Sequence, residues 1–551
     1  MTMGIETYPL PSSQSLTEAY IHQTDPKLAE RIGKHSSRAA DWQTRMAYLD
    51  ASKEARVPAS ELSAVLSAYN ERFNSHEAVK RGIELIQEGA PVIVGGQQAG
   101  LWTGPMLVIH KAVSVIQAAK EAAGHVGRPV VPVFWIAGED HDWEEANHAY
   151  IVTEQVRLRK IAVKRDAGLR TSVSRTKLDL AVLQTAMDEL AANLPDTPHK
   201  QELLSVLQGY MEQSATLSDW FAYVIGHLFG EYGLVMMDAD DPSLRKLEGP
   251  MFRQMITHND ELRAAYARGA AAVSELGYPV QAEATEGCAN IFLFQEEDGK
   301  LAGERTLLYK RKGKMENRKG TWSLDAEELL RMSDQSPERL SNNVLTRPIM
   351  QDYVLPVLGA VLGPGEIAYW ALTVEGFAAM GMQMPLLVPR MSFTLVEPQI
   401  ASLMTKFELT FDDTVHRLAD KKQAWLDQQD ELRIHEQFEE AKRQFAQLYE
   451  PLLAMASSVQ PALAELGDKN RGRILDQIDY MAMRTREAHD KRYDAVTHQL
   501  DRIAIALRPN GQPQERVLNV VHYWNQYGTG WLKQLLDVPF DALGNHRLVY
   551  I

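Results

Sequence analysis

Two stretches of the sequence hold polar side chains that can bind anions or transfer protons. The first is GQQAGLWTGPMLVIHK at 96–111, whose candidate residues are Gln97, Gln98, Gly100, Thr103, Gly104, His110 and Lys111. A glycine-bearing loop that opens a helix can direct backbone N–H groups at a carboxylate or phosphate. The pattern matches neither G-x-G-x-x-G nor a P-loop, so a purely structural alternative stays open, in which the glycines shape the turn and His110 lies on the helix surface.

The second stretch, AGEDHDWEEANH at 137–148, is rich in carboxylates and begins with Glu139, Asp140, His141 and Asp142. Such groups can bind a hard cation, or accept the proton of an amine as a general base. The spacing of the two histidines is not that of the H-E-x-x-H zinc motif, so a metal requirement stays unknown. Because acidic residues also favour the first turn of a helix, some of these side chains could simply cap the next helix.

A third set of candidates is dispersed along the chain: Asn343, Arg347, Gln351, Gly365, Glu366, Tyr369, Arg390 and Ser392. Arginine and asparagine suit the recognition of carboxylate or phosphate groups. Taken singly, each residue is typical of a surface or capping position. The set predicts a site only if the fold brings its members to one place.

The elements around the first two stretches predict a βαβ unit. Residues 90–95 and 129–137 are short apolar runs typical of buried strands, and a helix is expected over 106–123 with Pro105 in its first turn. Parallel strands joined in this way place their carboxyl ends at one edge of a sheet, where ligands of α/β proteins bind. Since both polar stretches follow such strands, we expect them to border one crevice.

Further strands are expected over 233–242, in 357–370 ahead of a Gly-Pro-Gly turn, and over 385–393. Helical patterns and antiparallel β segments occupy about 150–345 and read as insertions. One long helical run is expected over 243–277. The sequence therefore predicts an α/β fold with a Rossmann-like parallel sheet and insertions.

The pattern becomes almost wholly helical after residue 396. Apolar residues alternate in steps of four and three at Ile434, Phe438, Ala441, Phe445, Leu448, Leu452 and Met455, which indicates a heptad seam. Pro451 is expected to kink or end that helix. A second helical run over 471–507 predicts an antiparallel hairpin, and its seams in two phases favour a dimer contact beyond intramolecular packing.

Four parts follow: a helical segment at 1–88, the core at 89–395, a coiled-coil arm at 396–510, and a tail at 511–551 that folds back on the core. The formal net charge of −15 disfavours binding to nucleic acid or to anionic membranes. One cysteine, Cys288, excludes an internal disulfide and is expected to be structural. No apolar run reaches the roughly 18–20 residues of a membrane span, and no signal peptide is evident, so a cytoplasmic protein is expected.

Several blocks resemble one known family. QQAGLWTGPMLVIHKA, PVFWIAGEDHDWEEANH, SNNVLTRPIMQDYVLP, LGPGEIAYW, MPLLVPRMSFT and QERVLN are similar to the family of bacillithiol synthase, the cysteine ligase of bacillithiol biosynthesis. They occur in the same order over essentially the whole chain. The resemblance implies a Rossmann core with connecting-peptide insertions, as in class I aminoacyl-tRNA synthetases, and a coiled coil that promotes dimerisation. The HIGH and KMSKS motifs of those synthetases are not intact.

The resemblance also implies a reaction, in which the carboxyl of L-cysteine forms an amide with the amine of glucosaminyl-malate. Because a carboxylate must be activated first, we expect ATP to be consumed, with ADP or AMP as product. Gln97, Gln98, His110 and Lys111 are expected to stabilise the activated anion. Glu139, Asp140 and His141 would orient and deprotonate the amine, and Asn343, Arg347 and Arg390 would hold the malate carboxylates.

A second nucleotide pocket is expected near the base of the coiled coil, with Arg516, Asn519 and Trp524. Two alternatives to a ligase stay open. One is a metal-assisted amide hydrolase that uses the carboxylates of 139–148, and the other is a coiled-coil scaffold without catalytic activity.

Overall fold

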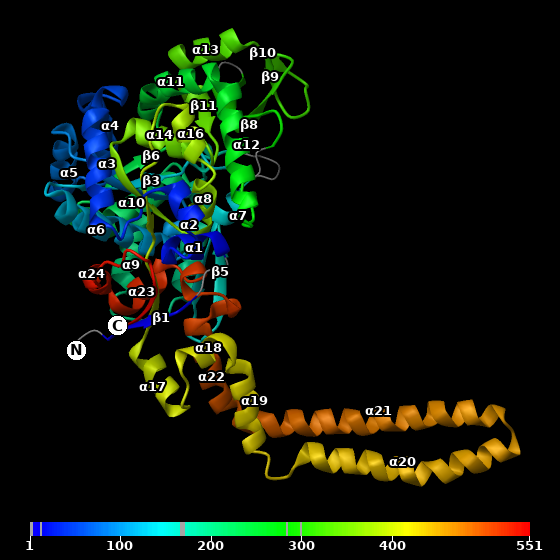
Figure 1. Cartoon of the computed structure of the whole chain (residues 1–551). Helices are drawn as coiled ribbons and strands as arrows, with labels where there is room; N and C mark the ends of the chain where they lie inside the picture. Colours follow the sequence, from blue (N-terminus) through cyan, green and yellow to red (C-terminus); the bar gives the residue numbers. More distant parts are fainter. Residues whose placement is uncertain (1–3, 11–13, 166–170, 283–284, 298–299) are drawn as a thin grey trace. The chain divides into compact units, whose positions relative to one another are not determined.

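The computed structural model describes residues 4–10, 14–165, 171–282, 285–297 and 300–551 (Figure 1). It divides into two compact units. The first comprises Met1–Leu395 together with Gln512–Ile551, and the second comprises Val396–Gly511. The C-terminal tail therefore belongs to the same unit as the core, although more than a hundred residues separate the two in sequence.

A five-stranded parallel sheet forms the centre of the first unit. Its order is β13 (Leu386–Pro389), β12 (Val357–Leu362), β2 (Val92–Gln97), β3 (Val131–Ile136) and β6 (Val235–Asp238). The chain enters at β2, runs outward through β3 and β6, and then returns to the other side of β2 to form β12 and β13. The order therefore reverses between β2 and β12, as in doubly wound Rossmann folds, and the predicted fold class is confirmed.

Both faces of this sheet are buried. Ile93, Phe134 and Met236 pack in one hydrophobic cluster with α6 (Leu107–Val126) and α10 (Leu217–Phe229). Val94, Val133 and Trp135, which alternate with them, pack in another cluster. The helices that contribute to that second cluster include α4 (Ala59–Phe73), α5 (Glu77–Gln87), α11 (Pro242–Thr257) and α14 (Arg347–Val354). Near-continuous apolar strands are the expected result of covering a parallel sheet on both sides.

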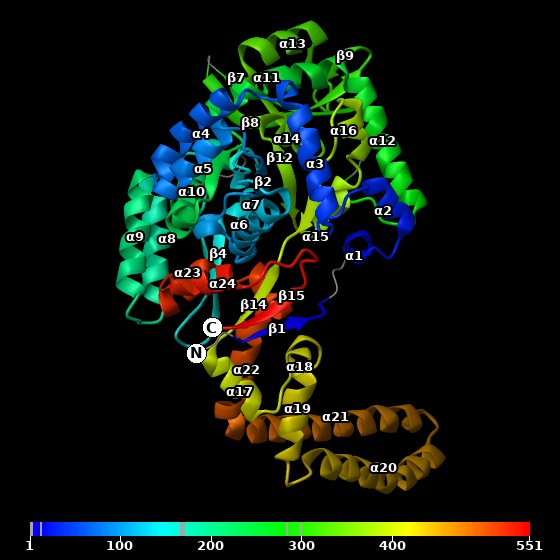
Figure 2. The same ribbon diagram turned by 60° about the vertical axis from the view of Figure 1, so that its left-hand side comes forward.

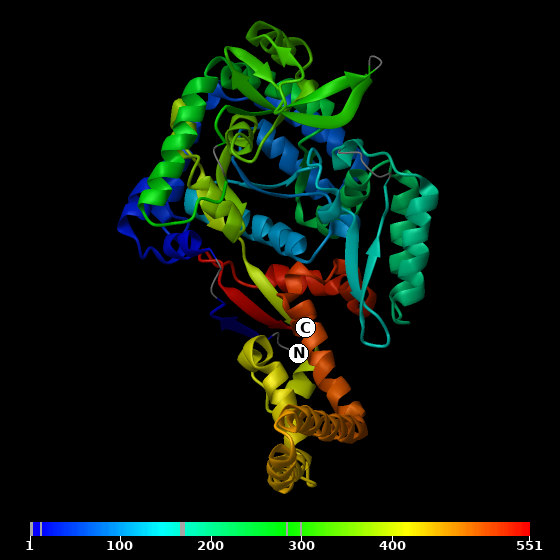
Figure 3. The same cartoon turned by 90° about the vertical axis from the view of Figure 1, so that its right-hand side faces the viewer.

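The insertions form two further sheets. An antiparallel sheet has the order β10 (Ser323–Leu324), β9 (Lys314–Glu316), β8 (Lys300–Arg311), β7 (Cys288–Glu297) and β11 (Leu340–Asn342). The other is the hairpin of β4 (His148–Val152) and β5 (Leu158–Ala162), which is visible in cyan in Figure 3. Helices α7 (Trp143–Ala146), α8 (Leu180–Asn193), α9 (Lys200–Gln213), α12 (Asn259–Glu275) and α13 (Ala326–Gln335) accompany these sheets.

The N-terminal and C-terminal segments meet in a small sheet with the order β1 (Ile5–Tyr8), β15 (His546–Tyr550) and β14 (Ser392–Val396), whose strands lie side by side in Figure 2. The remaining helices of the first unit are α1 (Ser15–His22), α2 (Pro26–Ile32), α3 (Ala39–Ala51), α15 (Pro364–Trp370), α16 (Val374–Ala379), α23 (Val520–Tyr527) and α24 (Gly530–Asp537).

Three predicted elements need correction. The expected strand at 385–393 is two strands, because β13 ends at Pro389 and β14 begins at Ser392 in a different sheet. The expected helix over 243–277 divides at His258 into α11 and α12. The run YPVQAEAT at 278–285 has the composition of one of the antiparallel β segments expected within 150–345, but it forms no strand where it is described; residues 283–284 lie outside the described part of the chain.

Apart from Val396, the last residue of β14, the secondary structure of the second unit is helical. It contains α17 (Pro398–Lys406), α18 (Phe411–His416), α19 (Leu418–Gln428), α20 (Ile434–Val459), α21 (Ala462–Asp490) and α22 (Asp494–Leu507). Helices α20 and α21 run antiparallel as the predicted hairpin (Figure 1), with Lys442 and Asp479 joined at 2.8 Å. Helix α20 continues through Pro451 to Val459, so the proline does not end it.

Candidate functional site

The reversal of strand order between β2 and β12 marks a crevice at the carboxyl ends of these strands. Lys111, on α6, closes its base: the ammonium group donates to the carbonyl of Gly96 at 2.8 Å and to Oε1 of Gln97 at 3.2 Å. The same group pairs with Glu366 at 2.5 Å, and Glu366 accepts from the backbone N–H of Gly363 at 2.7 Å. Lys111 and Glu366 thus tie the end of β2 to the beginning of α15.

Arg347 forms the next wall of this crevice. It donates to the hydroxyl of Tyr369 at 2.6 Å, and together with Gln351, Glu366, Gly96 and Trp135 it lines a narrow cavity of about 10 Å³ between the strand ends, with room for about one water molecule. Position 96 must be glycine here, because a Cβ would lie 2.4 Å from the carbonyl oxygen of Trp135. The predicted residues Gln97, Lys111, Arg347, Gln351, Glu366 and Tyr369 therefore meet in one place, and Gly365 lies exposed in the first turn of α15.

The crevice carries more positive than negative charge. Burial lowers the pKa of Lys111, and the Glu366 carboxylate opposes this effect. Burial raises the pKa of Glu366, but Lys111 and Arg347 outweigh it and hold that pKa below its ordinary value. An ionised Glu366 balances one of the two cations, so one positive charge is left to attract an anionic ligand.

The acidic stretch after β3 divides into a buried and an accessible part. Glu139 is buried, where it pairs with Arg245 of α11 and accepts from the hydroxyl of Ser341 at 2.6 Å. The side chains of Asp140 and His141 are 41% and 39% exposed. Asp140 and His141 can therefore reach a substrate, whereas the carboxylate of Glu139 is committed to partners within the protein.

Arg305 connects this strand end with the insertion sheet. Its guanidinium lies over the ring of Phe292 at 4.3 Å and donates to Asp140 and to His141, each at 3.4 Å. Nearby, Arg175 makes two hydrogen bonds of 2.8 Å to Asp240. Burial raises the pKa of Asp238 well above its ordinary value. At the ends of β3 and β6, three arginines therefore pair with three carboxylates: Arg175 with Asp240, Arg245 with Glu139, and Arg305 with Asp140.

His110 and Arg390 are predicted site residues that bind a residue of the tail instead. Both contact Glu515: His110 Nδ1 lies 2.6 Å from its carboxylate, and Arg390 makes two bonds of 2.6 and 2.7 Å. All three side chains are buried. Burial raises the pKa of Glu515, but Arg390 and His110 outweigh it and hold that pKa well below its usual range. This geometry gives His110 and Arg390 a structural role.

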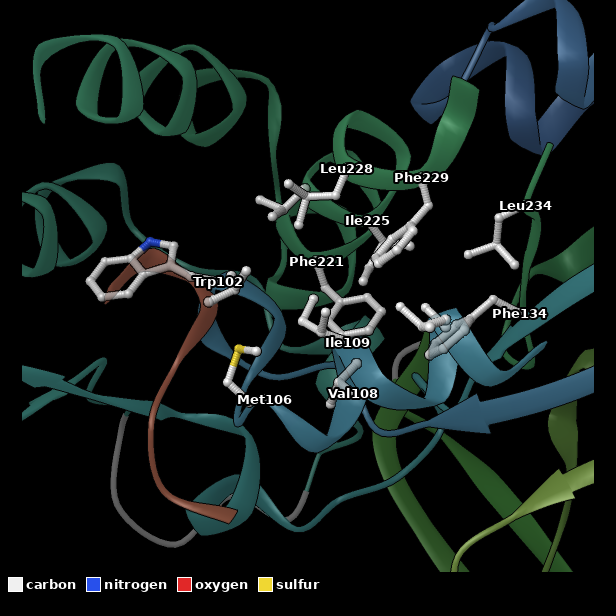
Figure 4. Close-up of a cluster of buried hydrophobic side chains, with 14 of the residues drawn as sticks. Trp102, Met106, Val108, Ile109, Phe134, Phe221, Ile225, Leu228, Phe229 and Leu234 are labelled. Atoms are coloured by element: carbon white, nitrogen blue, oxygen red, sulfur yellow. The ribbon is translucent and has the colours of Figure 1, made fainter. Parts of the chain in front are cut away.

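The glycine-bearing loop after β2 is buried rather than open to the crevice. Gln98, Gly100, Thr103 and Gly104 are all buried, and Figure 4 shows Trp102 and Met106 among the hydrophobic side chains of the core. Trp102 and Thr103 have positive φ values of 49° and 83°, which are strained for residues with a side chain. The amide of Asn519 donates to the carbonyls of Leu101, Trp102 and Gly104 at 3.1, 3.2 and 2.6 Å, so the tail holds this loop closed.

The other predicted residues also have local roles. Asp142 caps α7 through the N–H of Glu145 at 3.2 Å, which confirms the capping alternative for one member of the acidic stretch. Asn343 caps the turn before α14, and Ser392 bonds His546 at 2.9 Å. Arg516 is exposed while Asn519 and Trp524 are buried, an arrangement that lends no support to the expected second nucleotide pocket.

Sequence reasoning missed Glu515, Arg245, Arg305 and Ser341. Arg245 and Glu248 lie three residues apart on the buried face of α11, and they pair at 2.6 Å. Charged residues at buried positions of an amphipathic helix were the available signal for this pair. Glu515 is separated by one residue from the apolar run VLNVV at 517–521, and this position is a weaker indication that its side chain is buried.

Within the described part of the chain, no group of three or more His, Cys, Asp or Glu side chains is arranged to hold a metal ion. None of the helices in that part is long and apolar enough to cross a membrane. Cys288 is buried, and burial raises the pKa of its thiol, in agreement with a structural residue.

The fold and the crevice define a Rossmann-like α/β protein with a helical hairpin unit. Two family models match: the N-terminal Rossmann-like domain of bacillithiol biosynthesis BshC over residues 3–391, and its C-terminal coiled-coil domain over residues 393–551. The chain belongs to the BshC family. It is 35% identical over 491 residues to proteins named "Putative cysteine ligase BshC" from Bacillus cereus strain AH187 and from Bacillus cytotoxicus, covering 89% of this chain and 90% of each relative. A Bacillus anthracis relative of the same name is 35% identical over 486 residues, 88% of this chain and 89% of the relative.

Proposed function

We propose that this protein is a ligase that joins L-cysteine to the amine of glucosaminyl-malate in bacillithiol biosynthesis and consumes ATP. The names of its relatives support a cysteine ligase. The observation that carries the proposal is the excess positive charge of Lys111 and Arg347 over Glu366 between the ends of β2 and β12. The accessible Asp140 and His141 follow β3, the strand that pairs with β2. An amide synthase needs such a pair of features, one for an anionic substrate and one for the proton of the amine.

The reaction has two steps. ATP first activates the cysteine carboxylate, either as an acyl phosphate with release of ADP or as an acyl adenylate with release of diphosphate. The glucosamine nitrogen then attacks the acyl carbon, and phosphate or AMP leaves. The attacking amine loses one proton in this step. Asp140 and His141 are the accessible groups that can accept it.

The geometry changes the roles expected of several residues. Lys111, Arg347 and Gln97 remain the candidates for holding carboxylate or phosphate oxygens. Arg347 lines the cavity, and Lys111 contacts both Gln97 and Glu366, the latter also in the lining. Glu139 becomes a positioning residue, since it is buried with Arg245 and Ser341. His110 and Arg390 hold the tail through Glu515 and are no longer proposed to touch substrate.

The test is a product assay with purified protein, L-cysteine, glucosaminyl-malate and ATP, in which mass spectrometry detects the cysteinyl amide and either ADP or AMP. Product that depends on both cysteine and ATP is the expected result. Asp140→Ala should abolish turnover without unfolding the protein, whereas Glu144→Ala, at an exposed position on α7, should retain it. Full activity of Asp140→Ala would remove this residue from the site.

The same assay tests the two alternatives. Cleavage of an amide that EDTA abolishes would replace the ligase by a metal-assisted hydrolase. If the purified protein shows neither amide synthesis nor amide cleavage and forms a stable dimer, a scaffold without catalytic activity would be favoured. The single cysteine and the small-molecule substrates suit a reaction in the cytoplasm.

We further propose that two copies pair through the hairpin of α20 and α21. Leu448, Leu452, Met455 and Val459 follow the heptad spacing of α20, yet they are 70%, 49%, 61% and 78% exposed. A continuous apolar stripe of this kind marks an interaction surface. Sedimentation velocity should show a dimer that Leu448→Glu with Met455→Glu converts to a monomer; a wild-type monomer at micromolar concentration would contradict the proposal.

A further inference from the structure

A cavity of about 360 Å³ lies at the edge of the central sheet opposite the crevice. Pro91 and Pro356, which line it, precede the first residues of β2 and β12. Buried apolar side chains of α3, α4 and α5 form much of its wall, namely Met46, Leu49, Leu62 and Ile86. Small-molecule sites of about 300–1,000 Å³ combine mostly apolar walls with a few placed polar groups. The cavity has that size and composition.

A buried positive charge lies in the wall of this cavity. The side chain of Arg56 lines it and is only 6% exposed. Arg56 and the fully buried Arg45 share a single carboxylate, that of Asp352. Two guanidinium groups and one carboxylate leave one positive charge in excess, and a buried charge without a counter-charge is costly. Arg56 also donates to the carbonyl and the hydroxyl of Ser52 at 3.0 and 2.6 Å, so one N–H of its Nη2 is left for a ligand. An anion beside Arg56 would remove this cost.

The charged groups at the mouth do not supply that anion. Asp50 pairs with Arg128 at 2.8 Å. Lys53 and Glu54 are both exposed and have opposite charges. The lining as a whole therefore keeps the excess positive charge at Arg56.

The wall of the cavity is bonded directly to α14. Nε of Arg56 donates to the carbonyl of Asp352 at 2.9 Å, and the N–H of Val57 donates to the carbonyl of Tyr353 at 3.2 Å. Arg45 donates to the carbonyl of Val357, the first residue of β12, at 3.0 Å. Since α14 also places Arg347 and Gln351 in the lining of the crevice, one helix contacts both cavities.

We propose that this cavity is a second binding site, for a small and mainly apolar carboxylic acid, and that its occupancy acts on the crevice through α14. The carboxylate of the ligand accepts a hydrogen bond from Arg56, and the apolar body fills the space beside Met46 and Leu62. Binding is independent of the proposed function, whereas its effect on amide synthesis rests on that function.

Calorimetry with 2-naphthoate and with the neutral 2-naphthamide tests the binding. Wild-type protein should bind the anion at least about tenfold more tightly, because a charge-assisted hydrogen bond adds to the same apolar contact. Arg56→Gln should remove this difference. Ala59→Trp, which places an indole in the cavity, should weaken binding of both probes. Arg72→Gln, on α4 with a side chain 59% exposed and outside the cavity, is the matched control and should bind like wild type.

Two results would overturn the site: no binding of 2-naphthoate at millimolar concentration, or the same anion preference in Arg56→Gln as in wild type. The second comparison decides the question even if Ala59→Trp fails to fold. Hydrogen exchange tests the coupling, since saturating 2-naphthoate should slow exchange in residues 347–357. Unchanged exchange there would refute the coupling. A protein that binds 2-naphthoate but makes no amide would count against the proposed function alone.

Discussion

Replacing Glu515 by glutamine tests how the tail holds the core together. Glu515 accepts two hydrogen bonds from Arg390, at 2.6 and 2.7 Å, and one contact of 2.6 Å from His110. Removing one partner of a buried ion pair costs about 3–5 kcal/mol, because the remaining charge has no counter-charge. Glutamine keeps the shape and one acceptor oxygen, so we expect the free energy of unfolding to fall by about 3 kcal/mol.

The loss should depend on pH. The Arg390 guanidinium holds the pKa of Glu515 well below that of an unfolded glutamate, about 4.3, although burial acts in the opposite direction. The ionised carboxylate therefore adds stability above about pH 4.3, and this contribution is lost as the pH falls toward the folded pKa. The difference between wild type and Glu515→Gln should be constant from pH 6 to 8 and should shrink below about pH 4.

Urea unfolding followed by tryptophan fluorescence measures this difference, because Trp425 is the one tryptophan of ten outside the unit that contains Glu515. Glu30→Gln, at an exposed position of the same unit, is the control and should change the free energy of unfolding by less than about 0.5 kcal/mol. A change below about 1 kcal/mol in Glu515→Gln, or a difference that persists unchanged to pH 3, would refute the reasoning.

Two further substitutions have expected outcomes. Asn519→Leu removes the donor of three buried carbonyls in the loop after β2, so urea unfolding should show a loss of about 2–4 kcal/mol; a loss below 1 kcal/mol would contradict this role. Burial raises the pKa of Glu248 to about 7, so its ionisation destabilises the fold as the pH rises from about 4.5 to 7. Glu248→Gln should therefore gain up to about 3 kcal/mol relative to wild type between pH 5 and 8, and parallel stability curves would refute it.

The βαβ unit could be predicted because its apolar strands and helix have distinct periodicities. The expected helix over 106–123 is α6 at Leu107–Val126, and the expected strand at 129–137 is β3 at Val131–Ile136. The order of the five strands could not be read in the same way. It depends on which strand pairs with β2 after the insertions, and local sequence does not encode that choice.

Only the part of the site that lies at the ends of the predicted strands could be predicted from the sequence. Lys111, Arg347 and Glu366 meet because their elements end at the point where strand order reverses. The positions of His110 and Arg390 depend on a partner 405 and 125 residues away in sequence. A single chain without its fold gives no means of pairing Glu515 with them, and so their polar character was assigned to substrate binding.

Isothermal titration of glucosaminyl-malate tests most directly whether the crevice between β2 and β12 binds the acidic substrate. A charge-assisted hydrogen bond is worth about 1.5–3 kcal/mol, so Arg347→Gln should raise the Kd about 10- to 100-fold. Arg268→Gln, at an exposed position on α12, should bind like wild type. Equal affinities of wild type and Arg347→Gln would place the substrate elsewhere and contradict the account.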